Sequence, residues 1–430
     1  MEDSEPRGLE AAAGPAPLVV PLEGVLCRTG LAVERRLQAL SAEPLAALAG
    51  KGSVQPLAPE ALPLDPGVLE EVRAARAAGR RTILVTGADA DQARAVAEGL
   101  GLFDEVIAEA PEGRARADRV AETAGPDAEI AARRRPDGRA RLRAQVRALR
   151  PHQWSKNLLI FLPLLAAHDL SGAGAALAAF VAFSLTASSV YVLNDLADLA
   201  ADRAHPRKRL RPFASGDLSA AQGLRLAGGL ILGALAVALA FTPPLFLGVL
   251  ALYYAVTFAY SLWLKRKLII DVITLAGLYT IRLVAGAAAC GIVLSPWMLG
   301  FSMFLFLALA SVKRQAELTD MIAEGETGRA GRGYVPDDLP VIRAMALAAG
   351  YAAVLVFALY ISSDQVTSLY SAPEALWLVC PLLLYWISRM VMVTHRGHMD
   401  DDPIVYAATD KVSLAIVAGA AAIFAGATIA

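Results

Sequence analysis

Three aspartates and an asparagine lie at the end of one long apolar stretch, in the order Asn194, Asp195, Asp198 and Asp202. On a helix, the spacings i, i+3 and i+7 put the three carboxylates on one face, with the asparagine beside them. Carboxylates held this close repel one another unless a cation lies between them. Mg²⁺ meets this need, because proteins hold it by one or two carboxylates together with phosphate oxygens of a substrate. The spacing therefore predicts Asp195, Asp198 and Asp202 as Mg²⁺ ligands in a site for a diphosphate-containing substrate.

Basic residues follow the aspartates directly, at His205, Arg207, Lys208, Arg209 and Arg211. A departing diphosphate carries charge that cationic side chains must neutralise. We expect Arg207, Lys208 and Arg209 to bind phosphate oxygens. The alternative is a charged loop that only faces solvent.

A second polar site is expected two apolar stretches later, around Lys265, Asp271 and Arg282. Asp271 begins an apolar stretch and Arg282 lies inside it, where an ionisable residue is costly unless it faces a polar cavity. Eleven positions of helix span about 16 Å, too far for Asp271 and Arg282 to pair directly. We therefore expect Asp271 to contact a metal or phosphate, and Lys265 and Arg282 to bind phosphate oxygens.

A third cluster, Lys313, Arg314 and Glu317, closes the sixth apolar stretch. Its basic residues can supply further phosphate contacts. The alternative is an ordinary cytoplasmic helix end, since Lys and Arg collect there in membrane proteins. The acidic run 400–402 and Asp410 are expected to lie in solvated loops.

The elements that position these residues are apolar. Of the 430 residues, 56% are hydrophobic and the mean hydropathy is +0.49, well above the values of soluble domains. From Leu158 onward we count nine apolar stretches, several of them near the minimum length for crossing a bilayer. Residues 1–140 are instead rich in Arg, Glu and Ala. The pattern predicts a cytoplasmic N-terminal domain over 1–140 and a membrane domain of about nine helices over 145–430.

Lys and Arg gather in every second loop of the membrane domain, as the positive-inside rule requires for cytoplasmic loops. The N-terminal sequence lacks the basic region and the long apolar region of a secretory signal, so we expect it to stay in the cytoplasm. The loops with Lys208, Lys265 and Lys313 should then be cytoplasmic. Nine crossings put the C-terminus outside.

Several function classes receive no support. A formal net charge of -1 does not favour nucleic-acid binding. Cys27, Cys290 and Cys380 lack metal-ligand spacing, so neither a zinc site nor a disulfide framework is expected. A transporter is an alternative of a different class, but the sequence shows no inverted repeat and no pair of Gly/Pro-broken helices. A non-catalytic membrane anchor is a further alternative, against which the intact aspartate motif argues.

The pattern of Asn194, Asp195, Asp198 and Asp202 resembles the first signature, NDxxDxxxD, of the UbiA superfamily of intramembrane prenyltransferases. The resemblance covers about 149–430, including the nine-helix count and the segment that runs from Arg150 to Asn157. It implies an all-α bundle with a central cavity in the lipid bilayer, Mg²⁺, a diphosphate-containing donor and a polyprenyl lipid. It also implies that Lys156 contacts substrate.

Within the superfamily, the sequence is similar to the decaprenyl-phosphate phosphoribosyltransferase branch. The similarity is carried by His205 to Arg209, Asp271-Val272, Ile281-Arg282, and the cluster Lys313, Arg314 and Glu317. That branch implies 5-phosphoribosyl diphosphate as donor and a polyprenyl phosphate as acceptor. The alternative is prenyl transfer to an aromatic or other lipid acceptor, which is usually accompanied by several aspartates in a second motif. At the position of this second motif, the present sequence has a single aspartate, Asp271, together with Arg282.

The N-terminal segment resembles a haloacid dehalogenase-type domain, an α/β fold in which one strand ends in DxDGT and another in Thr or Ser. The matching residues lie in Leu18 to Gly24 and Thr82 to Thr86. Pro21 stands at the position of the nucleophilic Asp, and proline offers no nucleophile. We expect a degenerate docking or stability module without phosphatase activity, and the sequence predicts no partner for it. The alternative is that Val19 and Val85 belong to unrelated buried strands.

Overall fold

The computed structural model describes residues 15–42, 62–88, 90–110, 114–132, 137–167, 170–205, 207–327, 333–363, 366, 370–399 and 402–429. The chain divides into two compact units. The first comprises 1–151 and 191–228, and the second comprises 152–190 and 229–430. The boundary falls inside two long helices, α8 (Ala173–Ala197) and α10 (Ala220–Phe241), so each helix contributes residues to both units.

The first unit contains a four-stranded parallel sheet with the order β3-β2-β1-β4. Its strands are β1 (Leu18–Pro21), β2 (Thr82–Val85), β3 (Glu105–Ile107) and β4 (Glu129–Ile130). Parallel strands need helical crossovers, and such sheets are covered on both faces. Because both faces of the sheet are covered, β1 and β2 contain continuous runs of apolar residues that do not alternate with polar ones.

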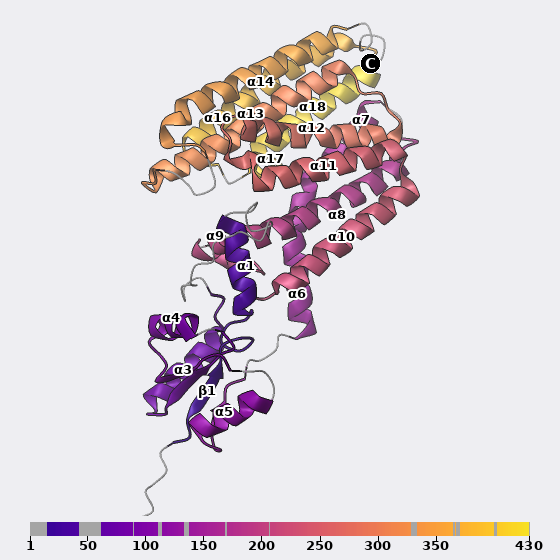
Figure 1. The fold of residues 1–430 in the computed structure, drawn as a ribbon. Coiled ribbons are helices and arrows are strands. Elements are labelled where there is room, and N and C mark those ends of the chain that lie inside the picture. Colours follow the sequence, from indigo (N-terminus) through magenta and orange to yellow (C-terminus); the bar gives the residue numbers. More distant parts are fainter. Residues whose placement is uncertain are drawn as a thin grey trace, which may run out of the picture. The chain divides into compact units, whose positions relative to one another are not determined.

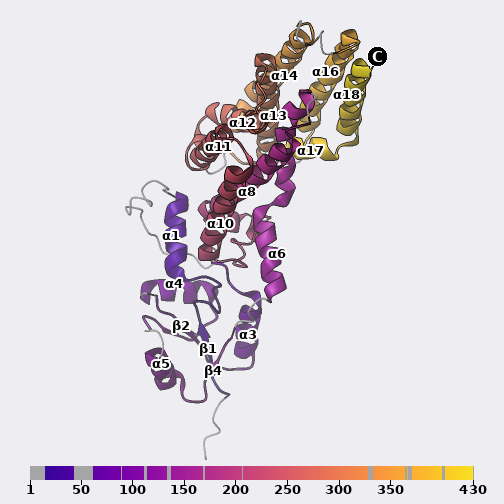
Figure 2. The ribbon, with the colours of Figure 1, turned by 90° about the vertical axis from the view of Figure 1, so that its right-hand side faces the viewer.

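Four helices accompany the sheet: α1 (Leu31–Ala42), α3 (Pro66–Ala77), α4 (Ala90–Leu100) and α5 (Arg114–Ala124). Alternate residues of a strand point to opposite faces. Leu18 and Val20 pack in one buried cluster with Val72 of α3, whereas Val19 packs in another with Val120 of α5. Figure 2 shows α3 and α5 on opposite sides of the strands. A small α/β N-terminal domain is thereby confirmed.

The rest of the first unit surrounds the aspartate motif. Helix α6 (Gly138–Leu149) ends at Arg150, whose φ of 51° lies in the left-handed region. The last residues of α8 lead into α9 (Leu199–Ala204) and the short 3₁₀ helix η3 (Lys208–Leu210). Ala148, Val192, Leu196 and Phe213 share one buried cluster, which joins α6, α8 and the segment after η3.

By length and composition, eight helices in the described part of the chain can cross a membrane. They are α8, α10, α11 (Pro244–Leu262), α12 (Ile270–Cys290), α13 (Pro296–Ala323), α14 (Leu339–Ile361), α16 (Val379–His395) and α18 (Lys411–Ile429). The spans of α14 and α16 include the 3₁₀ helices directly before them, and so begin at Pro336 and Pro373. In the second unit α11, α12, α13 and α14 pack in chain order, and α16 packs on both α14 and α18. Figure 1 shows these neighbours side by side. The chain is an integral membrane protein built as a helix bundle, as expected.

The first of the nine apolar stretches, which begins at Leu158, does not form a single long helix. It forms the 3₁₀ helix η2 (Pro151–Phe161) followed by the five-residue helix α7 (Leu162–Ala166). Pro163 occupies the first turn of α7, where its missing N–H and fixed φ are tolerated, but a continuous α-helix through this position would lose a hydrogen bond. The main chain of Ile160 lies against Gly286 of α12.

Candidate active site

The aspartate motif lies where α8 ends and α9 begins. Asp195 is in the last turn of α8, Asp198 stands between the two helices, and Asp202 is in α9. The Asp198 N–H donates to the Asn194 carbonyl at 2.8 Å, and the Asp202 N–H donates to the Asp198 carbonyl at 2.9 Å. Because these bonds keep the helical i to i−4 pattern across the break, the aspartates remain on one face, as the spacing predicts.

Two arginines bind the carboxylates of this motif. Asp195 is 3% exposed and pairs with Arg150, and its Oδ1 lies 3.3 Å from Arg211 Nη1. The same Nη1 atom donates to Asp202 Oδ2 at 2.7 Å. Two carboxylates on one cation show that Asp195 and Asp202 converge on a single position for positive charge.

This convergence fits Mg²⁺, which proteins hold with one or two carboxylates plus phosphate oxygens. Within the described residues, no group of three His, Cys, Asp or Glu side chains is arranged to hold a metal ion. A metal at this position would therefore depend on substrate oxygens for the rest of its ligands. Burial raises the pKa of Asp202 above its ordinary value, against the lowering effect of Arg211, so a divalent cation would stabilise the ionised form.

The basic run after the motif is exposed. Arg207, Lys208 and Arg209 all lie at the surface around η3. The Nδ1 atom of His205 accepts from the backbone N–H groups of Arg207 and Lys208, at 3.2 and 3.4 Å, which shapes the turn that presents them. The structure thus brings the aspartates and the basic run into one unit.

Asp271 opens α12 with its side chain fully buried in the second unit. Its Oδ2 lies 2.6 Å from Arg314 Nη2, and its Oδ1 accepts from the Tyr260 hydroxyl at 2.8 Å. Arg314 also pairs with Glu317, and its guanidinium lies 5.2 Å from the centre of the Tyr334 ring. Asp271 and Arg314, predicted in two separate sites, therefore form one buried ion pair.

The backbone before Asp271 is strained. Ile269 has a φ of 65°, a conformation in which a β-branched residue is a genuine outlier. Its N–H donates to the Tyr334 hydroxyl at 3.0 Å. Such strain persists only where the surroundings hold it, and it concentrates at functional sites.

Arg282 lies inside α12, as expected, and does not contact Asp271 directly. Its Nε donates to Asn157 Oδ1 at 2.9 Å, and its Nη1 donates to the carbonyl of Leu278. The guanidinium lies 5.3 to 5.5 Å from three aromatic ring centres, those of Phe183, Tyr253 and Tyr279. Ring faces attract a cation in this range, so an arginine is held inside a membrane helix without an acidic partner among these contacts.

The expectation of a solvated loop at 400–402 is wrong for Asp402, which is 8% exposed. Asp402 pairs with Lys156 and lies 3.7 Å from Lys313 Nζ. Burial alone would raise the pKa of Asp402, but the charges of Lys156 and Lys313 hold it below the ordinary value. Lys156 and Lys313, both predicted to bind substrate, therefore lie around the same carboxylate. Asp400 and Asp401 lie outside the described residues.

The same expectation fails for Asp410, which lies between α17 (Pro403–Thr409) and α18. Both of its oxygens accept from Arg389, at 2.7 and 3.0 Å, and its side chain is 13% exposed. Hydrogen bonds from Arg389 lower the pKa of Asp410 to about 2. This acid is therefore a structural partner of α16 and not a solvated loop residue.

Lys265 is half-buried in the 3₁₀ helix η4 (Leu264–Arg266), between α11 and α12.

Several residues of the site were not predicted from the sequence. They are Asn157, which contacts Arg282, Tyr260, which contacts Asp271, Asp402, which contacts Lys156, and Arg150, which contacts Asp195. Asn157 and Arg150 lie in a segment singled out only by resemblance. A signal for Asp402 was available, since an acid directly before Pro403 is a frequent helix N-cap.

In the N-terminal domain, the carboxyl ends of β1 and β2 lie side by side, as expected for a haloacid dehalogenase-type fold. Pro21 closes β1, and Thr86, just after β2, donates from its hydroxyl to Glu23 Oε1 at 2.5 Å. The parallel register pairs Pro21 with Val85. A hydrogen-bonded Thr–Glu pair therefore occupies the edge where the resemblance expects the nucleophile.

Comparison with known families gives two matches. The model of the UbiA prenyltransferase family matches residues 158–408. The model of haloacid dehalogenase-like hydrolases matches residues 28–161.

Several proteins are similar to this chain. The uncharacterized protein y4nM of Sinorhizobium fredii is 35% identical over 405 residues, which cover 84% of this chain and 78% of that protein. Nodulation protein NoeC of Azorhizobium caulinodans is 40% identical over 280 residues, 64% of this chain and 90% of that protein. Decaprenyl-phosphate phosphoribosyltransferase of Mycolicibacterium smegmatis is 33% identical over 278 residues, 62% of this chain and 86% of that protein.

Among solved structures, a UbiA homologue from Archaeoglobus fulgidus bound to GPP and Mg²⁺ is 15% identical, with a TM-score of 0.48, and the match covers 66% of this chain and 99% of that chain.

Proposed function

This chain belongs to the UbiA prenyltransferase family, and on that premise we propose that it transfers a 5-phosphoribosyl group from phosphoribosyl diphosphate to a polyprenyl phosphate. The family makes it a membrane transferase. The donor and the acceptor are the parts of the proposal that need support from the site.

The observation that carries the donor assignment is the buried ion pair between Asp271 and Arg314. Asp271 is the acid of the second motif, and an arginine and the Tyr260 hydroxyl bind its oxygens. Both oxygens of Asp271 have partners, whereas Asp195 and Asp202 share the single atom Arg211 Nη1, so a metal that replaces one cation is better placed at the first motif than at Asp271. The second site is thus better suited to phosphate groups, which arginine and lysine bind by charge-assisted hydrogen bonds.

One of the relatives supports the same donor. The similar protein from Mycolicibacterium smegmatis is named decaprenyl-phosphate phosphoribosyltransferase. Phosphoribosyl diphosphate has a 5-phosphate that a prenyl diphosphate lacks, and this group needs cations of its own. Lys265, Arg282, and the pair of Lys156 and Lys313 at Asp402 are the candidates for it.

The proposed reaction forms one bond and breaks one. A phosphate oxygen of the polyprenyl phosphate attacks C1 of the ribose, and the bond between C1 and the diphosphate oxygen breaks. The electron pair of that bond leaves with the diphosphate. Arg207, Lys208 and Arg209, which are exposed beside the aspartates, neutralise the charge that accumulates on the leaving group.

Asp195, Asp198 and Asp202 would hold Mg²⁺, which when bound stabilises negative charge on the diphosphate. The convergence of Asp195 and Asp202 on Arg211 supports this assignment. In the absence of the ion, Arg150 and Arg211 keep the buried acids neutralised.

An apolar groove in the second unit suits the isoprenoid chain of the acceptor. The groove has a volume of about 370 Å³ and is lined mainly by aliphatic and aromatic side chains, among them Leu158, Leu162, Phe306 and Trp386. Lys156, which is paired with Asp402, also lines it, and this places a cation beside the groove for the phosphate at the head of the lipid.

Prenyl transfer to an aromatic or other lipid acceptor is the second candidate. The family itself favours it, because the matching model is that of prenyltransferases. The aspartate motif serves a prenyl diphosphate as well as a phosphoribosyl diphosphate.

Diphosphate release by the purified protein in detergent separates the two candidates. Each donor, phosphoribosyl diphosphate or geranyl diphosphate, is supplied with Mg²⁺ and with either polyprenyl phosphate or an aromatic acceptor. We expect release only from phosphoribosyl diphosphate with polyprenyl phosphate. If diphosphate is released from geranyl diphosphate and not from phosphoribosyl diphosphate, the protein is a prenyltransferase and the proposed donor is wrong.

A further inference from the structure

The N-terminal domain holds the chain segment that follows the aspartate motif. This segment, 203–217, contains the exposed basic run and the motif partner Arg211, and it lies in the same unit as the N-terminal domain. Two groups of contacts join them, one at each end of the segment.

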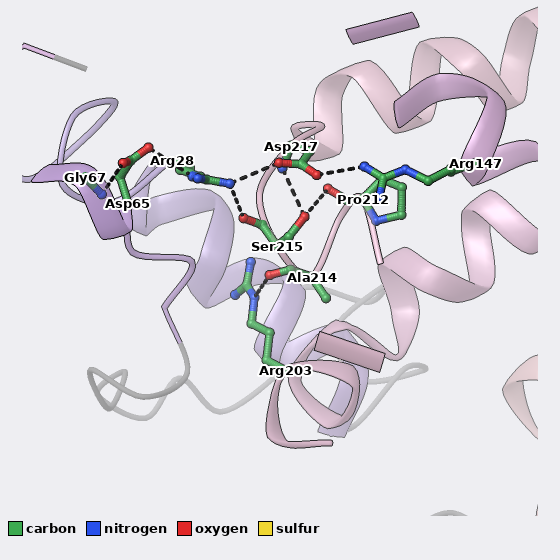
Figure 3. Close-up of polar contacts among 9 residues, drawn as sticks. All are labelled: Arg28, Asp65, Gly67, Arg147, Arg203, Pro212, Ala214, Ser215 and Asp217. Atoms are coloured by element: carbon green, nitrogen blue, oxygen red, sulfur yellow. Dashed lines mark hydrogen bonds and ion pairs between the residues drawn. The ribbon is translucent and has the colours of Figure 1, made fainter. Parts of the chain in front are cut away.

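The first group is centred on Arg28, which follows β1 (Figure 3). Its Nη1 donates to the Ser215 carbonyl and to Asp217 Oδ1, both at 3.0 Å. Its Nε is held by Asp65 Oδ2 at 3.1 Å. Asp217 accepts in addition from Arg147 of α6 at 3.1 Å. One guanidinium thus joins the N-terminal domain to the far end of the segment.

Gly216 allows this close approach. Its φ is +75°, and an added Cβ would lie 2.8 Å from Arg28 Cβ and 3.0 Å from Pro63 Cβ. No side chain fits there without a shift. The far end of the segment is therefore in tight steric as well as polar contact with the N-terminal domain.

The second group joins Glu34 of α1 to Arg203, the residue directly after Asp202. Their side chains are 1% and 7% exposed. Glu34 also accepts from the Thr29 hydroxyl, and Arg203 Nε donates to the Ala214 carbonyl at 3.2 Å. A buried pair of this kind is geometrically demanding, since the loss of one partner leaves an uncompensated charge.

We propose that the N-terminal domain is an intramolecular clamp that positions segment 203–217 for phosphate binding, with Arg28 and Glu34 as its positioning residues. The proposal rests on the proposed function only for the role of the segment in binding phosphate. Both ends of the segment are fixed to the clamp, and the basic run between them is exposed. A domain with proline at the nucleophile position thereby gains a role that needs no chemistry of its own.

The test compares Arg28→Ala and Glu34→Gln with a matched control, Arg81→Ala, in the full-length protein in detergent. Arg81, directly before β2, forms an exposed pair with Glu105 of β3 at 2.5 Å, so the control also removes an arginine–glutamate pair from the same domain. Amide hydrogen exchange of 203–217 is measured without substrate, and kcat and KM for the donor are measured with Mg²⁺.

We expect Arg28→Ala and Glu34→Gln to speed exchange in 203–217 by about tenfold and to raise the KM for the donor more than they lower kcat. Arg81→Ala should change neither. The double variant Glu34→Gln with Arg203→Gln should recover part of the loss, because two amides can hydrogen-bond and no buried charge remains. If Glu34→Gln does not fold, Arg28→Ala still tests the clamp. The Arg28 side chain is 19% exposed, so its removal is less disruptive than a change at the buried Glu34.

The clamp is refuted if exchange in 203–217 and the donor KM are unchanged in Arg28→Ala, or if Arg81→Ala changes them equally. A wild-type protein that consumes neither donor would overturn the proposed function alone. The exchange comparison would then still test the clamp, because it uses no substrate.

Discussion

Asp195 and Asp202 are buried acids next to a membrane helix end, and Arg211 contacts both of them. Burying a carboxylate without a partner costs several kcal/mol. The arginines Arg150 and Arg211 remove this cost when no metal is bound. The same convergence makes the position attractive to a divalent cation, so one arrangement serves both stability and the proposed chemistry.

Asp195→Asn and Asp198→Asn should each lower Mg²⁺-dependent turnover by about 100-fold or more, because a neutral amide does not balance a divalent charge. Folding should persist, which circular dichroism and thermal melting in detergent can check. Asp337→Asn, at an exposed position of the 3₁₀ helix η5 (Pro336–Asp338), is the matched control. Normal turnover in either motif variant would rule out the metal site.

The pair of Asp410 and Arg389 should make stability depend on pH. Hydrogen bonds from Arg389 lower the pKa of Asp410 from 3.8 to about 2, so its stabilisation is complete above pH 3.8 and is lost as the pH falls toward 2. Asp410→Asn should therefore lower the free energy of unfolding by about 2 kcal/mol at neutral pH.

Melting temperatures of the wild type and of Asp410→Asn, measured in detergent from pH 7 down to pH 3, check this prediction. The difference between the two proteins should narrow below pH 4. A difference that stays constant over the whole range would mean that the ion pair does not account for the stabilisation.

At the scale of elements, the packing of η2 on α12 positions Lys156 and Asn157. A Cβ on Gly286 would lie 1.9 Å from the Ile160 carbonyl oxygen, so no side chain fits between these elements. Gly286→Ala should therefore displace η2 and cost about 2 kcal/mol or more.

The matched control is Gly277→Ala in the same helix, where a Cβ would meet nothing within 4 Å. It should be neutral or slightly stabilising, because alanine favours helix. Apparent melting temperature in detergent and donor KM measure both effects. Equal behaviour of the two variants would show that the close approach at Gly286 is unimportant.

The helices and the aspartate face could be predicted because each depends on local sequence. Apolar length fixes α10 or α14, and spacing fixes the face shared by Asp195, Asp198 and Asp202. The partners of Asp271 and Asp402 could not be predicted. Arg314 and Lys156 are distant from them in sequence, and nothing in the local pattern encodes the pairing. The form of η2 was missed for a related reason, because hydropathy gives the extent of an apolar stretch but not its hydrogen-bond pattern.

At the scale of the whole molecule, the contact between the N-terminal domain and segment 203–217 constrains the topology. Both must lie on the same side of the bilayer. The chain between them contains α8, whose 25 residues cross once, so a second crossing has to come from η2 and α7.

We therefore predict nine crossings, with Lys208, Lys265 and Lys313 on the cytoplasmic side. In a variant without its native cysteines, Lys208→Cys and Lys265→Cys should react with an impermeant maleimide only after the cells are permeabilised. Thr242→Cys, in the short connection between α10 and α11, should react in intact cells. Labelling of Lys208→Cys or Lys265→Cys in intact cells would require a different helix count.

The most direct test of the proposed transferase function follows the 5-phosphate of the donor. The purified protein is incubated with Mg²⁺, polyprenyl phosphate and phosphoribosyl diphosphate labelled with ³²P at the 5-phosphate, and the lipid is extracted. We predict that label enters the lipid fraction with wild type and not with Asp195→Asn. A lipid fraction without label, together with transfer of a prenyl group from labelled geranyl diphosphate, would contradict phosphoribosyl transfer.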